Sequence, residues 1–349
     1  MDPKNNPFGL FSIVAATVII ALGAYIGFDR PPIDAVQIGY RGVGMEQIDN
    51  PRTVARAAAL HVAPPPLDPV EPAGTPSSEV YQNVQVLGDL DSDEFTRLMS
   101  AITEWVSPEQ GCAYCHAEGE ELSSDSLYTK VVARRMLQMT QHINNDWHSH
   151  VGAVGVTCYT CHRGQPVPAN IWFEDRGPPA VMGMAGYRAG QNVASTAAVS
   201  ASLPTDPFTP FLLGDQNIRV IATTALPEGS PSQDIKATEW TYSLMMHLSD
   251  GLGVNCTYCH NSRSFFVWEA STPARVTAWH GIRMARDLNV AYLDPLRDVY
   301  PANRLGPHGD APKANCATCH AGRAKPLNGA SMVKDYTGLG TPAAAPATQ

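Results

Sequence analysis

The sequence predicts a mainly helical protein with much irregular structure, preceded by one N-terminal transmembrane helix. Residues 8–28 contain no charged side chain. Four later segments have the apolar periodicity of amphipathic helices. Proline (29) and glycine (28) are frequent among the 349 residues, and only 16% of residues are charged. This composition favours long irregular connections between short helices.

The N-terminal apolar stretch, within residues 1–30, is long enough to cross a bilayer. At about 1.5 Å per residue, a helix over 8–28 spans roughly 30 Å, the thickness of a hydrocarbon core. A cleaved signal peptide is the alternative, but the apolar run exceeds a typical signal core and no small-residue cleavage site follows it. We therefore expect a retained membrane-anchor helix. Lys4 alone indicates its orientation only weakly.

Two regions follow, first an extended segment and then a helical one. Residues 31–90 include the proline-rich stretch 61–78 (HVAPPPLDPVEPAGTPSS), which is typical of an extended linker. Residues 91–165 are predicted to contain helices at 93–105 and 130–144. The first of these has an acidic N-terminus and Ser92 as its candidate cap.

The C-terminal part of the chain repeats this plan after a connecting segment. Residues 166–234 are rich in Pro, Gly, Ala and Ser, which predicts an irregular connection. Residues 235–330 contain predicted helices at 239–250 and 273–288. Residues 331–349 end in TPAAAPATQ and are predicted to form a disordered tail. A short sheet in the N-terminal or the connecting segment is left open.

One five-residue pattern, Cys-x-x-Cys-His, occurs four times and uses all eight cysteines. It is the attachment signature of c-type haem: the thiols form thioethers with the haem vinyl groups, and the His supplies one axial nitrogen to iron. Two zinc sites are the alternative, but zinc has no use for a His after every second Cys. The sequence thus predicts a multihaem cytochrome c with four covalently bound haems. The attachment residues are Cys112 and Cys115, Cys158 and Cys161, Cys256 and Cys259, and Cys316 and Cys319, followed by His116, His162, His260 and His320.

An internal repeat relates the two haem-bearing regions. Residues 134–144 (RRMLQMTQHIN) align with residues 279–289 (WHGIRMARDLN), which pairs Asn144 with Asn289. The expected fold therefore consists of two pseudo-repeated halves, each with a pair of haems.

Each iron needs a second axial ligand, and methionines or histidines on the upstream helices are the candidates. For the fourth haem, Gly281 stands where the repeat predicts a ligand, so a more distant His is expected. The methionine candidates are Met99 for the first haem, Met136 or Met139 for the second, and Met245 or Met246 for the third. The available histidines are His142, His148, His150, His247, His280 and His308, each more often a surface or propionate-bonding residue.

The formal charge of −9 makes the protein acidic, and haem propionates would add to that charge. An acidic surface argues against nucleic acid as a partner and suits a basic soluble protein. The alternative is that the charge serves solubility only.

From about Gln37 to Asp335 the chain resembles the tetrahaem cytochrome subunit of purple-bacterial photosynthetic reaction centres. The similar stretches are ITEWVSPEQGCAYCH, KVVARRMLQMT, VGVTCYTCHRG, STPARVTAW, GIRMARDLN and APKANCATCHAG. In that family three haems have Met/His ligation, and the fourth takes its distal His from just before the second motif. The resemblance implies these axial pairs: Met99 with His116, Met136 with His162, Met245 with His260, and His150 with His320.

The resemblance implies an electron carrier, not an enzyme, which re-reduces the photo-oxidised bacteriochlorophyll special pair. The third haem would lie nearest that pair, followed outward by the fourth, the second and the first. A soluble cytochrome c or a high-potential iron–sulfur protein would be the donor. The implied partners in the complex are the L and M subunits with their bacteriochlorophylls, the H subunit and the light-harvesting antenna.

The implied location is the periplasmic face of the photosynthetic inner or intracytoplasmic membrane. Some family members are anchored by lipids on an N-terminal Cys, but no cysteine precedes Cys112 here. The predicted N-terminal helix would therefore carry the anchoring.

Arg275, between the third and fourth motifs, is a predicted haem-propionate contact, and an ordinary solvated position is the alternative. Two other functions compete with the electron relay. A membrane-anchored respiratory multihaem quinol dehydrogenase also combines one helix with four haems, but the Met placements and long linkers argue against it. A multihaem reductase needs a five-coordinate iron, which would leave His150 free.

Overall fold

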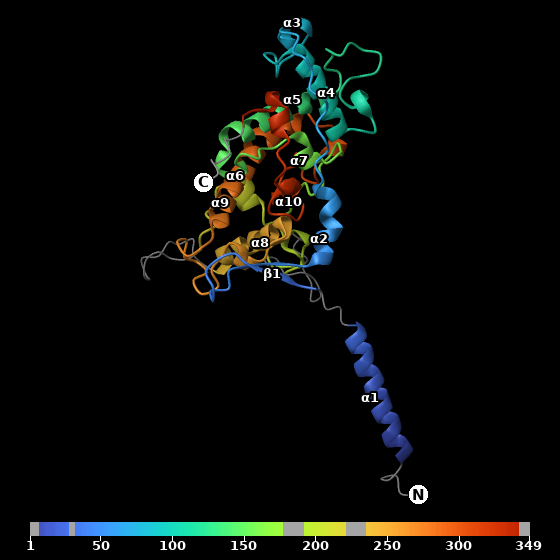
Figure 1. Cartoon of the computed structure of the whole chain (residues 1–349), viewed down its shortest axis with the longest axis vertical. Helices are drawn as coiled ribbons and strands as arrows, with labels where there is room; N and C mark the ends of the chain where they lie inside the picture. Colours follow the sequence, from blue (N-terminus) through green and yellow to red (C-terminus); the bar gives the residue numbers. More distant parts are fainter. Residues whose placement is uncertain (1–6, 28–31, 177–191, 221–234, 342–349) are drawn as a thin grey trace.

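The computed structural model describes residues 7–27, 32–176, 192–220 and 235–341. Within these ranges the protein is mainly helical, with long irregular connections and a single two-stranded sheet. Helix α1 (Pro7–Gly27) lies apart from a body that contains all four Cys-x-x-Cys-His motifs (Figure 1). The parts of the predicted anchor, connecting segment and tail at 1–6, 28–31, 177–191, 221–234 and 342–349 lie outside the described residues.

Helix α1 coincides with the predicted anchor, which confirms the helix but not the span. In the portion of the chain that the structure describes, no helix meets the combined requirement of length and apolar character for crossing a membrane. The transmembrane assignment therefore stays a prediction.

The N-terminal segment forms a hairpin followed by a short helix. Strands β1 (Asp34–Gln37) and β2 (Glu46–Asp49) pair antiparallel, which is the short sheet that the sequence left open. Helix α2 (Pro51–Ala57) begins where the Asn50 side chain accepts a hydrogen bond from the Arg52 backbone N–H at 3.0 Å. A proline at its first turn suits this position, since that N–H has no helical partner. The following stretch, 62–73, is irregular as predicted.

Helices α4 (Ser92–Val106) and α5 (Tyr128–Asp146) carry the first core and confirm two predicted helices. The predicted cap is corrected by one residue: Asp91, not Ser92, accepts from the backbone N–H of Asp93 at 3.0 Å. A carboxylate caps a helix N-terminus well because it accepts from free N–H groups and faces the positive end of the dipole. The buried members of this core are Leu87, Leu98, Ala101, Trp105, Leu137, Leu327, Met332, Val333, Tyr336 and Leu339.

Four of these residues, Met332, Val333, Tyr336 and Leu339, correct the expectation that the chain after 330 is a disordered tail. Residues 326–339 form three short turns whose apolar side chains fill the first core. Tyr336 packs edge-on against Trp105 with ring centroids 4.8 Å apart, and its hydroxyl accepts from the Leu67 backbone N–H at 3.0 Å. This segment and the proline-rich stretch are therefore held against the same core.

Helices α8 (Ile235–Leu252) and α9 (Pro273–Asp287) carry the second core and confirm the other two predicted helices. Part of the connecting segment contributes to this core. Its buried members are Trp172, Phe208, Phe211, Leu212, Leu244, Ile282 and Ala285. Each pair of long helices thus has its own apolar cluster.

Short helices complete the described fold. They are η2 (Ala58–His61), α3 (Ser77–Val80), η3 (Gly111–Tyr114), α6 (His148–Val151), α7 (Cys158–His162), η4 (Thr196–Ala198), η5 (Thr209–Leu213), η6 (Cys256–Tyr258), η7 (Leu288–Leu293), η8 (Asp294–Asp298), η9 (Ala302–Arg304), α10 (Cys316–His320), η10 (Pro326–Gly329), η11 (Val333–Asp335) and η12 (Thr337–Leu339).

Candidate haem-binding sites

The four motifs adopt two alternating local structures. The first and third lie in 3₁₀ turns, η3 and η6, and the second and fourth form short α-helices, α7 and α10. Both α-helices start with a capping box, formed by Thr157 with Thr160 and by Asn315 with Thr318. In such a box, side chain and backbone satisfy each other's free N–H groups. Local hydrogen bonds therefore hold the second and fourth motifs in helical form.

The four motif histidines share one hydrogen-bond pattern. In each, Nδ1 lies 2.7–2.9 Å from a backbone carbonyl oxygen a few residues later. A carbonyl only accepts hydrogen bonds, so Nδ1 carries the proton and Nε2 keeps its lone pair. The hydrogen bond from Nδ1 fixes the orientation of the ring, so that Nε2 can bind a metal ion. The acceptors are Leu122 for His116, Gln165 for His162, Phe265 for His260 and Arg323 for His320.

Burial favours the neutral form of three of these rings, which is the form that binds iron. Burial lowers the pKa of His162 and of His260, and lowers that of His320 to about 4. A protonated imidazole has no lone pair to donate, so a depressed pKa favours ligation at neutral pH. The residues present fit a haem iron at each motif.

His150 lies against the fourth motif, although 170 positions separate it from His320 in the chain. The two rings have centroids 5.9 Å apart, and His150 Nδ1 lies 3.0 Å from the Thr277 carbonyl oxygen. This separation leaves room for one metal ion between two nitrogens, since such bonds are about 2 Å long. Burial lowers the pKa of His150 as well.

Gly281 provides the space that His150 occupies. A Cβ atom at position 281 would lie 2.5 Å from His150 Cε1 and 2.9 Å from Nδ1, closer than real Cβ contacts. The missing side chain in the repeat is therefore filled by an imidazole from the other half of the protein.

The three predicted methionine ligands are half-buried on the long helices: Met99 on α4, Met136 on α5 and Met245 on α8. Met99 packs against the first core and Met245 against the second. The rival residues Met139 and Met246 are also half-buried, so burial alone does not choose between neighbours. Their ligand roles stay predictions.

The cysteines differ in exposure and in partners. Cys112 and Cys256 are exposed, whereas burial raises the pKa of the Cys158 and Cys316 thiols to about 12. Cys161 and Cys319 lie side by side, with Cα atoms 4.4 Å apart. The second and fourth motifs are therefore neighbours in the folded chain. In the described ranges, no three His, Cys, Asp or Glu side chains gather as the zinc alternative would require.

Comparison with known proteins decides the family. The model of the photosynthetic reaction centre cytochrome c subunit matches residues 29–340. The chain belongs to this family. It is 53% identical to the photosynthetic reaction center cytochrome c subunit of Rubrivivax gelatinosus, with 96% of this chain and 92% of the relative aligned. The corresponding subunits of Thermochromatium tepidum (49% identical; 93% and 79% aligned) and Roseobacter denitrificans (42%; 97% and 95%) are also similar.

Family membership confirms the coarse predictions made from the sequence. The chain is a cytochrome c subunit with covalently bound c-type haem, and it transfers electrons to a photosynthetic reaction centre. It is associated with the reaction-centre complex and hence with the photosynthetic membrane. The respiratory quinol dehydrogenase fits these findings less well than the electron relay does.

Arg275 contacts the loop that orients the third motif histidine. Its Nη1 donates to Ser271 Oγ at 2.7 Å and to the Val267 carbonyl at 3.1 Å, and its guanidinium lies over the Trp268 ring at 4.4 Å. The same loop supplies the Phe265 carbonyl that accepts from His260. The propionate contact of Arg275 stays a prediction. The role of Arg275 in holding this loop could not be predicted from the sequence, because a backbone carbonyl acceptor can belong to any residue type.

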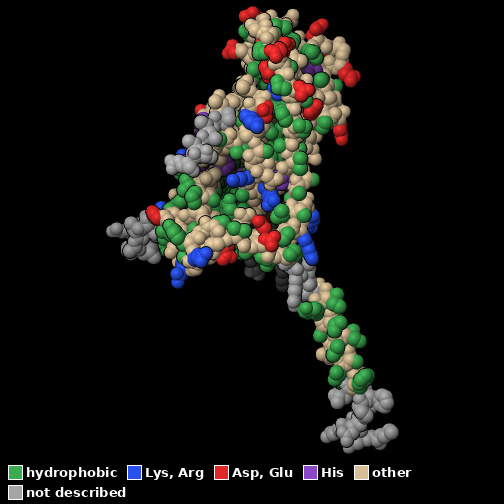
Figure 2. All heavy atoms as spheres, in the orientation of Figure 1, with side chains coloured by type: hydrophobic (Ala, Val, Ile, Leu, Met, Phe, Trp, Pro, Cys, Tyr) green, Lys and Arg blue, Asp and Glu red, His purple; other side chains and the backbone are tan. Residues whose placement is uncertain are grey.

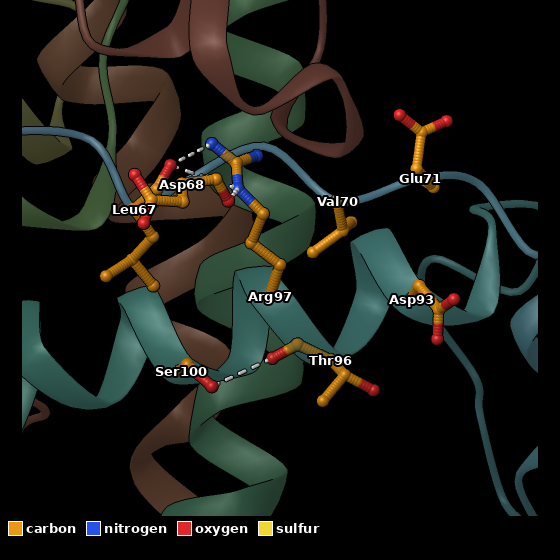
Figure 3. Close-up of a pocket in the computed structure, with 8 residues that line it drawn as sticks. All are labelled: Leu67, Asp68, Val70, Glu71, Asp93, Thr96, Arg97 and Ser100. Atoms are coloured by element: carbon orange, nitrogen blue, oxygen red, sulfur yellow. Dashed lines mark hydrogen bonds between the residues drawn. The ribbon is translucent and has the colours of Figure 1, made fainter.

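A cavity of about 530 Å³ lies between the proline-rich stretch and α4. Figure 3 shows Arg97 turned toward the linker, where its guanidinium donates to the Leu67 carbonyl at 2.8 Å and its Nε donates to the Asp68 carbonyl at 2.8 Å. None of the residues that line the cavity is a motif residue or a predicted ligand. This cavity is therefore a packing feature of the linker and not a haem site.

Proposed function

We propose that the chain is a tetrahaem electron relay that carries electrons from a soluble periplasmic donor to the photo-oxidised special pair. The observation that carries this proposal is the shared geometry of the five histidines His116, His162, His260, His320 and His150. Each has Nδ1 bonded to a backbone carbonyl and Nε2 left for iron.

The proposed axial pairs are Met99 with His116, Met136 with His162, Met245 with His260, and His150 with His320. Bound haem supplies one-electron chemistry, and a Met ligand raises the potential relative to a second His. The protein's own residues hold each imidazole in one orientation and fill both axial positions. Six-coordinate irons leave no position for a substrate, which suits a carrier and not a reductase.

The proposed docking face toward the L and M subunits is the end of the body that carries the third motif. Helix α8 and strand β1 lie at the end of the body nearest α1, and α3 and α4 lie at the opposite end (Figure 1). Apolar side chains are exposed here, including Phe265 (45%) and Phe266 (56%) beside His260. Exposed aromatic residues favour a protein interface. The H subunit and the antenna stay expectations of the resemblance.

The opposite end would receive the soluble donor. Acidic side chains gather around α3 and α4 (Figure 2), close in sequence to the first motif. The exposed ones are Glu79, Asp89, Asp93, Glu104, Glu109, Glu118, Glu120 and Glu121. A surface of one sign steers an oppositely charged partner and loses this effect as salt rises. A basic donor, either a cytochrome c or a high-potential iron–sulfur protein, fits this surface.

Helix α1 is the proposed attachment to the membrane, with the haem-bearing body on the periplasmic side. Its apolar side chains are exposed: Phe11 by 74%, Ile19 by 70% and Ile26 by 74%. Apolar side chains without protein contacts are stabilised by a lipid environment. The periplasmic side follows because c-type haem is attached outside the cytoplasm.

Flash-induced absorbance change of the haem α-band, in membranes that contain this chain, tests the proposal. Haem oxidation within microseconds of the flash is the expected result, and the amplitude at different poised potentials would rank the haems. Haems that stay reduced after the flash, but are reduced from the oxidised state by added quinol, would refute the relay and favour the respiratory alternative. Re-reduction by the soluble donor should slow as salt is raised.

A further inference from the structure

Asn144 and Asn289 occupy equivalent places in the two halves. Each side chain is completely buried, with no exposed area. Asn144 lies near the end of α5, and Asn289 lies just beyond the end of α9. Each stands eight residues after the predicted axial-ligand position of its repeat, Met136 or Gly281. A fully buried amide must have its hydrogen bonds satisfied, so its partners indicate what it holds.

Both amides bond twice to one backbone residue. Asn144 Nδ2 donates to the Val156 carbonyl at 2.9 Å, and its Oδ1 accepts from the Val156 N–H at 2.8 Å. Asn289 makes the same pair of bonds with Ala314, at 2.9 and 2.8 Å. Val156 and Ala314 each stand two residues before the first Cys of a motif. One planar amide with two bonds to one residue fixes distance and orientation together, which a single bond does not.

These bonds join the two segments that would flank the second haem and the two that would flank the fourth. One segment is the helix that carries the distal side: α5 with Met136 for the second haem, and α9 with Gly281 and the Thr277 carbonyl for the fourth. The other segment is the motif helix, α7 or α10, with the proximal His. Each amide also donates to a third segment, to Leu339 O at 2.6 Å or to Leu212 O at 3.1 Å. One side chain thus fixes the positions of the segments on both sides of the proposed haem.

We propose that Asn144 and Asn289 are positioning residues that set the axial geometry of the second and fourth haems, each for its own haem. This inference rests on the proposed function, because it presupposes haems at these motifs. A methionine–iron bond is weak and sensitive to the position of its helix, so Asn144 controls whether Met136 stays on the iron. Asn289 controls the segment that holds His150 through Thr277.

The test compares Asn144→Ala and Asn289→Ala in the complete haem-loaded subunit. Asn144→Ala should lower the potential of the second haem and remove about one third of the methionine-to-ferric-iron absorption band, since one of three Met-ligated haems is affected. The electron paramagnetic resonance signal of the bis-His haem should not change. Asn289→Ala should shift that signal and leave the methionine band intact.

Two further variants separate positioning from general stability. Asn145→Ala is the matched control, because Asn145 is exposed on the same helix and its Oδ1 accepts from Thr341 at the surface; all four haems should stay unchanged. Asn144→Ser is the second variant, because it stays polar and neutral, loses the paired bonds to Val156, and places no charge against the Val156 and Leu339 carbonyls. It should shift the second haem in the same direction as Asn144→Ala, and it keeps the test open if the alanine variant fails to fold.

Two results would overturn the inference while the relay stands: unchanged potentials and spectra in both alanine variants, or equal shifts of all four haems in either one. A parent chain with fewer than four haems by pyridine haemochrome assay would instead refute the proposed function itself. The two failures are therefore distinguishable.

Discussion

Gly281→Ala tests the assignment of His150 as a distal ligand with the smallest possible change. The added Cβ would lie 2.5 Å from His150 Cε1, whereas ordinary contacts begin at 3.4 Å. The ring, or helix α9, must therefore move by about 0.9 Å. A metal–nitrogen bond of about 2 Å does not stretch by that amount. We expect His150 to leave the iron of the fourth haem.

The same substitution should weaken the fold only slightly. Alanine is favoured over glycine in a helix interior by about 1 kcal/mol, which offsets part of the roughly 1–3 kcal/mol that overpacking costs. The free energy of unfolding should therefore fall by at most about 2 kcal/mol, while one haem loses its sixth ligand. Carbon monoxide should bind about one quarter of the reduced haem in the variant and none in the parent, because the proposed ligand pairs would leave no open position on any parent iron.

Two spectra decide the outcome. The bis-His signal in electron paramagnetic resonance should disappear in Gly281→Ala and persist in Gly23→Ala, a control in α1 where an added Cβ meets nothing within 4 Å. If Gly281→Ala keeps the bis-His signal and the potential of the fourth haem, His150 is not the ligand. Carbon monoxide binding by the parent protein would equally contradict the assignment and favour a reductase.

Three further predictions concern single side chains. Burial alone lowers the pKa of His142, but its bonds to Asp287 (2.6 Å) and to a second aspartate outweigh burial and raise it above 6.5. The protonated ring stabilises the fold fully below pH 6.5, and this contribution is lost as the pH rises through the raised pKa. The melting temperature of the parent should therefore fall over that range, and the melting temperature of His142→Gln should change less. Met99→His should keep the first haem six-coordinate but lower its potential in a redox titration; an unchanged potential would exclude Met99 as ligand. Lys313→Met leaves the buried Asp310 without its ammonium partner at 2.6 Å. The free energy of unfolding, measured with denaturant, should fall by about 3–5 kcal/mol. The double variant with Asp310→Leu should recover most of that loss.

The helices were predictable because their signals are local. All four amphipathic segments became helices within a few residues of the predicted ends, since apolar periodicity and capping residues act within one or two turns. The cap at Asp91 was missed by one position because Ser92 and Asp91 both suit that role, and only the backbone conformation decides between them. The turns after Pro326 were missed because their packing partners lie far away in the sequence.

The repeat was informative beyond its alignment. Pairing Asn144 with Asn289 had no interpretation in the sequence, yet both amides bond to the residue two positions before a motif. Similarly, the missing side chain at Gly281 predicted that a distant histidine is the ligand, but the repeat did not identify which histidine. A shared pattern therefore marks equivalent positions, but the contacts at those positions belong to the folded chain.

Local patterns were enough to predict where haem would attach and which His would be proximal, because each motif is five consecutive residues whose geometry is local. They also predicted the long helices and the family, both of which are confirmed. No pattern in the sequence showed that His150 enters the space at Gly281, that Cys161 lies beside Cys319, or that the end of the chain completes the first core. These contacts join residues far apart in the chain, so they depend on how the helices pack and not on any pattern along one segment.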